Sequence, residues 1–88
     1  MADVMEIFEK KSAEFCTYLQ NEIDNNRYLS DQRKQQFRDM LQECADQSKK
    51  YQDKELAFNQ GLQEINQKFF MTTGSNLIRK PFEVRSIA

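Results

Sequence analysis

The chain contains no histidine or tryptophan, a single proline, and only two residues each of glycine and cysteine. Without histidine, the side chain best suited to proton transfer near neutral pH is missing. Two cysteines are too few for a disulfide scaffold, and without histidine they do not make a zinc site. Nothing resembles a glycine-rich phosphate loop, an activated nucleophile or an EF-hand. We therefore expect a protein that is not an enzyme and that has no catalytic residues, metal site or cofactor.

Long apolar runs are also lacking. The first ten residues mix acidic and apolar side chains, and no run approaches the roughly 18 apolar residues that a membrane span requires. We therefore expect no membrane span and no signal peptide, with reduced thiols and a cytoplasmic location. A chain of 88 residues makes one small domain, which often depends on partners for stability.

The net charge is also small, at −1, but the charged residues are unevenly distributed along the chain. Residues 1–71 carry thirteen acidic and ten basic side chains, whereas residues 72–88 carry Arg79, Lys80 and Arg85 against Glu83 alone. A nearly neutral body does not generate the basic field typical of nucleic-acid binding. We expect no nucleic-acid partner. Salt-dependent nucleic-acid binding by the basic tail is a third hypothesis, ranked below two kinds of protein binding.

The chain does contain a heptad pattern that runs from residue 37 to residue 69. Steps of four and three residues give positions that are mostly apolar: Phe37, Leu41, Cys44, Ser48, Tyr51, Glu55, Phe58, Leu62, Ile65 and Phe69. The residues between them are mostly Gln, Lys, Asp and Glu, as on the solvated face of an amphipathic helix. The pattern predicts one long, coiled-coil-like helix over residues 30–70, with Ser30 as its N-cap.

A first amphipathic helix is predicted over residues 3–25. Asp3 and Glu6 form a capping-box-like pair at its start. Its apolar residues fall on one face at helical spacing: Phe8, Phe15, Cys16, Leu19 and Ile23. Asparagines follow this helix and favour a turn over residues 26–29. The two helices then form an antiparallel hairpin within residues 1–71, and the expected fold class is all-α.

The two predicted helices differ in length, roughly 60 Å for the second against roughly 33 Å for the first at 1.5 Å per residue. The hairpin therefore leaves an apolar stripe at the end of the second helix uncovered, which is typical of an interface. A second copy, a different protein or the folded-back tail would cover it. A break near residues 47–53, giving a three-helix bundle, is the less favoured alternative, because the heptad phase continues and no glycine or proline marks a stop.

Residues 72–88 are predicted to form a mostly non-helical C-terminal tail. Gly74 is a natural helix cap, and Pro81 does not continue a helix. Phe82 and Val84 alternate with polar residues, so we expect an extended strand or a docking peptide. No other strand is predicted in the chain, so β pairing would require a partner.

Four residues on or near the apolar faces of the two predicted helices have plain structural interpretations. Cys16 and Cys44 are expected to be small core residues. Ser48 either specifies the register of the seam or loosens it, and Glu55 is expected to point to water, because burial of an unpaired carboxylate is costly.

The expected function is protein–protein interaction, by an adaptor or chaperone-like subunit that packs the seam of its long helix against a partner helix or a second copy. The predicted partner-binding residues are Phe58, Leu62, Ile65, Phe69, Phe70, Phe82 and Val84, and the predicted basic tail residues are Arg79, Lys80 and Arg85. The alternative is a monomeric inhibitor-type module that occupies a site on a larger protein through the acidic residues Asp39, Glu43 and Asp46. We expect a protein partner or a homodimer and no small-molecule ligand.

Overall fold

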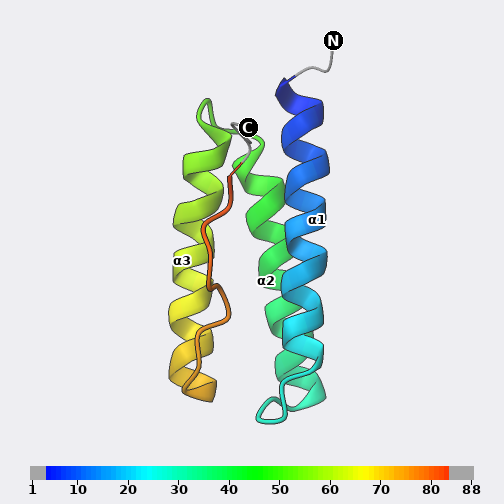
Figure 1. The fold of residues 1–88 in the computed structure, drawn as a ribbon, viewed down its shortest axis with the longest axis vertical. Helices are drawn as coiled ribbons and strands as arrows, with labels where there is room; N and C mark the ends of the chain where they lie inside the picture. The colour runs from blue at the N-terminus through cyan, green and yellow to red at the C-terminus, as the bar shows by residue number, and fades with distance from the viewer. Residues whose placement is uncertain (1–3, 84–88) are drawn as a thin grey trace.

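The computed structural model describes residues 4–83, which form three α-helices and no strand (Figure 1). The helices are α1 (Val4–Asp24), α2 (Asp31–Ser48) and α3 (Lys54–Thr73). The prediction of an all-α fold is confirmed. Helix α2 packs against both α1 and α3, and residues 74–83, here called the tail segment, run back along α3 in the space between α1 and α3.

The turn between α1 and α2 forms where the sequence predicts it. Ser30 is the N-cap of α2, and its hydroxyl accepts a hydrogen bond from the backbone N–H of Arg33 at 3.2 Å. Asp24 is an acid at the end of α1, where the helix dipole disfavours negative charge. An ion pair with Arg38 of α2 compensates for this position and ties the end of α1 to α2.

The predicted continuous helix over residues 30–70 is wrong, because α2 ends at Ser48 and α3 begins at Lys54. Backbone hydrogen bonds from Lys50 to Gln47 and from Tyr51 to Ser48 close a tight turn, and the Asp53 carboxylate caps α3 by accepting from Leu56 N–H at 3.1 Å. The less favoured three-helix alternative is the one that the structure shows.

Hydrophobic burial explains why the chain breaks there. The turn brings the apolar stripe of α3 back against α1 and α2, and four large side chains leave water: Phe58, Leu62, Ile65 and Phe69. At about 1.5–3 kcal/mol for each side chain, this burial outweighs the few helical hydrogen bonds lost at the turn, which are worth about 1 kcal/mol each. The five residues between the helices preserve the heptad phase, so the pattern alone does not distinguish a straight helix from a folded one.

Candidate protein-binding surfaces

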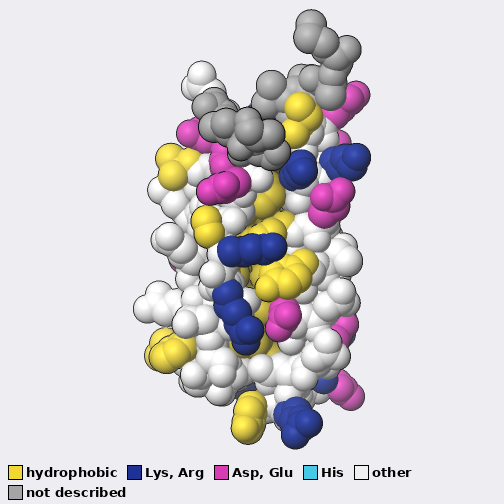
Figure 2. Space-filling view, in the orientation of Figure 1, with side chains coloured by type: hydrophobic (Ala, Val, Ile, Leu, Met, Phe, Trp, Pro, Cys, Tyr) yellow, Lys and Arg dark blue, Asp and Glu magenta, His cyan; other side chains and the backbone are white. Residues whose placement is uncertain are grey.

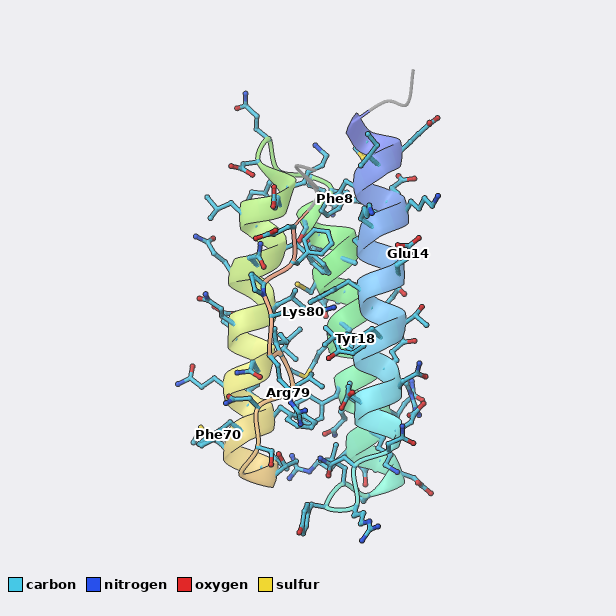
Figure 3. The ribbon with its side chains drawn as sticks, in the orientation of Figure 1. Phe8, Glu14, Tyr18, Phe70, Arg79 and Lys80 are labelled. Carbon is cyan, nitrogen blue, oxygen red and sulfur yellow. The ribbon has the colours of Figure 1, made fainter. Side chains whose placement is uncertain are left out.

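The stripe predicted to bind a partner is covered within the chain. Phe58, Leu62, Ile65 and Phe69 are 0%, 1%, 5% and 2% exposed, respectively. Phe37 of α2 packs edge-on against Phe69 with ring centroids 5.4 Å apart. The expectation of an uncovered stripe is therefore wrong, because α1, α2 and the tail segment all pack against it. Phe70 remains 49% exposed, and Figure 3 shows it pointing away from the bundle.

Phe82 of the tail segment also lies in the core, where it is 3% exposed. Its ring centroid is 4.7 Å from that of Phe58, 5.4 Å from that of Phe15 and 6.0 Å from that of Phe8. Edge-to-face pairs of this kind add about 0.5–1.5 kcal/mol each to the burial itself. The tail segment is thus anchored in its own chain. Val84 and Arg85, which were predicted to take part in binding, lie outside the described residues.

Two asparagines of α3 hold the backbone of the tail segment. The Asn66 side-chain oxygen accepts from the N–H groups of Leu77 and Ile78 at 2.7 and 2.9 Å. The Asn59 side-chain oxygen accepts from Phe82 N–H at 3.1 Å, and its amide nitrogen donates to Phe82 C=O at 2.9 Å. Sequence reasoning missed both residues. The available signal was two poor helix formers, seven residues apart, beside the apolar stripe of a predicted helix.

Arg79 and Lys80 are exposed, and Figure 3 shows both on the outer side of the tail segment. The Lys80 ammonium lies 5.1 Å from the centroid of the Tyr18 ring on α1, which is a cation–π distance. Acidic side chains share this face of the molecule (Figure 2). The predicted basic residues therefore belong to a surface of mixed charge rather than to an isolated basic peptide.

A second surface, the α2–α3 groove, lies between these two helices and has a volume of about 620 Å³. Successive residues of an α-helix are rotated by about 100°, so Gly61, two positions after Asn59, lies on the opposite side of α3. A Cβ atom at Gly61 would lie 2.5 Å from Cys44 Sγ, so the missing side chain admits the thiol of α2 against the backbone of α3. Gly61 within a predicted helix was the sequence signal for this close approach.

The rim of the α2–α3 groove combines exposed apolar side chains with acids. Tyr51 and Leu56, which are 60% and 54% exposed, lie at the end where the two helices are connected. The charged residues that line the groove are three acids and one base, namely Glu43, Asp53, Glu64 and Lys68. The groove thus offers apolar contact area within a negative field.

The acidic residues of the alternative hypothesis lie on α2 and are exposed. Gln35 and Gln42 donate hydrogen bonds to Asp39 and Asp46 at 2.8 and 3.2 Å, respectively. Lys49 lies 3.8 Å from Asp46. Glu43 lies between these positions and lines the groove, so the acidic face of α2 and the groove are contiguous.

The two cysteines are free, with Cys16 buried and Cys44 half-buried. Burial raises the pKa of the Cys16 thiol to about 11, and the nearby Cys44 and Asp46 contribute in the same direction. Burial also raises the pKa of the Cys44 thiol, while the hydrogen bond with Ser48 lowers it and Glu64 raises it. A raised pKa keeps each thiol protonated and a poor nucleophile. Both cysteines occupy packing positions, as the sequence predicts.

Residues 4–83 contain no cluster of acidic and cysteine side chains arranged to hold a metal ion. Within the same residues, every helix is too short or too polar to cross a membrane. Comparisons of the chain with protein-family models, with curated proteins and with solved structures found no match.

Proposed function

We propose that the protein is a protein-binding module that receives a helix of a partner protein in the α2–α3 groove. The observation that carries this proposal is the groove itself, an open surface with Cys44 and Gly61 in its lining and two exposed apolar side chains at one end. Because the apolar stripe of α3 is already covered within the chain, the groove replaces that stripe as the binding surface.

Charge indicates the kind of helix that fits. Three acids against one base give the charged residues of the lining a net charge of −2, and Asp39 and Asp46 continue the acidic face along α2. A partner helix with apolar residues on one side and Lys or Arg at the edges would complement this arrangement. Along α3 the lining extends from the N-cap Asp53 to Lys68, which is roughly 23 Å at 1.5 Å per residue and matches a helix of about four turns.

This proposal combines the two hypotheses drawn from the sequence. It keeps the helix-to-helix interaction of an adaptor, and it uses the acidic face of α2 that an inhibitor-type module would use. The apolar rim contributes contact area, while the acids select the partner and its orientation.

A titration with a defined probe tests the proposal. The probe is a synthetic sixteen-residue amphipathic helix made of Leu and Lys, and its control replaces every Lys with Glu. We expect the Lys peptide to shift the amide signals of Cys44 and Gly61 in the isotope-labelled full chain. Equal binding of the Glu peptide would contradict the proposed charge selection.

Matched variants test whether the Lys peptide binds at the α2–α3 groove or through general charge attraction to the protein. We expect the Glu43→Lys/Glu64→Lys chain to bind the Lys peptide at least roughly tenfold more weakly, since two favourable charge contacts become repulsive. Glu14→Lys on α1 lies outside the groove and supplies the control for charge. Tyr51→Asp at the rim is compared with Tyr28→Asp, because Tyr28 is also an exposed tyrosine but lies in the other turn. Equal effects of the two tyrosine variants would contradict the assignment.

A further inference from the structure

The tail segment is bound in the manner of an extended peptide. It lies antiparallel to α3, because Asn66 contacts Leu77 and Ile78 whereas Asn59 contacts Phe82. The surface of α1 and α3 that it covers is called the tail site below. This site lies on the opposite side of α3 from the α2–α3 groove, so the inference that follows is independent of the proposed function.

The polar contacts of the tail site are mostly with backbone groups, although the Asn66 amide also donates to the Asn76 side chain at 3.0 Å. Asn59 and Asn66 are separated by two helical turns, or about 10.5 Å, a spacing comparable to the four residue steps of extended chain from Ile78 to Phe82. Asn59 both donates to and accepts from the same residue, as a neighbouring β-strand would. Side chains that supply strand-like hydrogen bonds allow an extended segment to bind without a sheet.

Two buried anchors give the site its selectivity. Leu77 is 2% exposed, and Phe82 enters the cluster formed by Phe8, Phe15 and Phe58. Main-chain contacts combined with pockets for spaced side chains are the elements of peptide recognition. The segment that fits has an aliphatic residue, four intervening residues and then phenylalanine.

The connection between α3 and the bound segment is short and exposed. Gly74 has φ of +79°, and it is the only described residue with a positive φ. A Cβ atom built there meets none of the described residues within 4 Å, and Ser75 and Asn76 are also exposed. Hydrogen bonds of Thr73 with Ser75 and of Asn66 with Asn76 hold the connection, and the turn itself requires the left-handed conformation of Gly74.

We propose that the tail site binds the C-terminal segment of a second copy of this chain, which gives a domain-swapped dimer. Each copy carries both the site and the segment that fits it, so exchange preserves the contacts of Asn59, Asn66 and Phe82 and changes only the connection at residues 74–76. The tail segment of the same chain competes at an effective concentration of roughly millimolar. The exchange therefore occurs at high local concentration or when the connection does not turn back.

A hinge variant tests the exchange in the full chain. Gly74→Val disfavours the left-handed conformation that the monomer requires at residue 74. A dimer has two such hinges, and relief of the strain at each one should favour the dimer by a factor of about five or more. We therefore expect the dimer dissociation constant to fall roughly 25-fold or more. Ser75→Val is the matched control, since it adds a similar side chain to the same exposed connection without a positive φ. Light scattering from 10 µM to 1 mM measures the dissociation constants. A Gly74→Val chain that remains monomeric at 1 mM, or a dimer that survives the addition of Phe82→Ala unchanged, overturns the proposal.

Binding in trans provides a second test that does not depend on the hinge. The probe is a fluorescently labelled peptide with the sequence of residues 75–83, added to full-length Leu77→Ala, in which the chain's own segment competes less well. We expect this peptide to bind Leu77→Ala at least tenfold more tightly than it binds the unmodified chain. We also expect the peptide with Phe82→Ala not to bind. Absence of peptide binding by a Leu77→Ala chain with native helical circular dichroism overturns the proposal.

Discussion

At the scale of single residues, Gly61 determines how closely α2 and α3 approach. Cys44 Sγ lies where a side chain at position 61 would begin, and it donates a weak hydrogen bond to Phe58 C=O at 3.7 Å. Glycine within a helix costs about 1 kcal/mol relative to alanine, so the close approach is obtained against helix propensity. The two residues form one packing unit and should be substituted together.

We predict that Gly61→Ala destabilises the unmodified chain but stabilises a chain in which Cys44 is replaced by alanine. In the unmodified chain, overpacking against the thiol costs about 1–3 kcal/mol and exceeds the gain in helix propensity, so the free energy of unfolding should fall. In a Cys44→Ala background, the remaining neighbour is Cβ at 3.7 Å, and Gly61→Ala should stabilise by about 1 kcal/mol. Urea unfolding of the four chains measures both effects. The same sign in both backgrounds would contradict the packing assigned here.

The pKa of Cys16 predicts a pH dependence of stability. The thiol has a pKa of about 11 in the folded chain against 9.0 as its ordinary value, so the unfolded chain releases the proton first. This contribution to stability is complete below pH 9 and is lost as the pH rises from about 9 to about 11. We expect the unmodified chain to lose more stability than Cys16→Ala over this interval, as measured by urea unfolding. Equal losses of stability in the two chains would show that folding does not raise the pKa of the Cys16 thiol.

At the scale of elements, the tail segment completes the core that the three helices leave open between α1 and α3. Phe82 joins side chains of both helices, and Asn59 fixes its backbone from α3. Its role is therefore that of a fourth packing element without secondary structure of its own. A stripe that appears too long for a helical hairpin is covered by the turn before α3 and by this segment.

We predict that Asn59→Ala lowers the free energy of unfolding by about 1–3 kcal/mol, because it leaves the N–H and C=O groups of a buried residue without their partners. Gln63→Ala is the matched control on α3, because Gln63 is exposed and its loss should cost less than about 0.5 kcal/mol. Thermal unfolding followed by circular dichroism gives the difference. Equal effects of the two substitutions would contradict the role assigned to the hydrogen bonds between Asn59 and Phe82.

Local signals in the sequence predicted the elements better than their connections. Ser30 caps α2 and Gly74 caps α3 as expected, because these positions depend on backbone preferences that one residue expresses. The turn at residues 49–53 was not favoured, because the heptad phase continues across it. Ser48 and Asp53, two residues that compete with helix backbone, were the local signs of the break. The choice between a straight and a folded arrangement depended on tertiary burial, which periodicity does not measure.

The candidate surfaces were predicted less well, for a related reason. Residues such as Phe58 and Ile65 were correctly recognised as a packing stripe, but their partner was assigned outside the chain. The contacts of Asn59 depend on a segment that lies 23 residues further along the chain. The α2–α3 groove depends on the angle at which two helices meet. Asn59, Asn66 and Gly61 are local signals of these contacts, but the sequence does not identify which segments pack against them.

At the scale of the whole molecule, α3 is the element that both proposed binding sites share. Its buried face completes the core, Asn59 and Asn66 hold an extended segment on one side, and Gly61 lines the α2–α3 groove on the other. One helix thus separates a surface suited to a partner helix from a site suited to an extended segment. This arrangement is a three-helix bundle rather than an extended coiled coil.

The measurement that most directly tests this account is amide hydrogen exchange of the full chain, followed by NMR at Leu77, Ile78 and Phe82. These three N–H groups donate to Asn66 and Asn59, so the account predicts exchange at least roughly 100-fold slower than in an unstructured peptide. Exchange at the rate of an unstructured peptide would show that the tail segment is not docked. The part of the α3 stripe that the tail segment covers, which includes Phe58, would then be open to a partner.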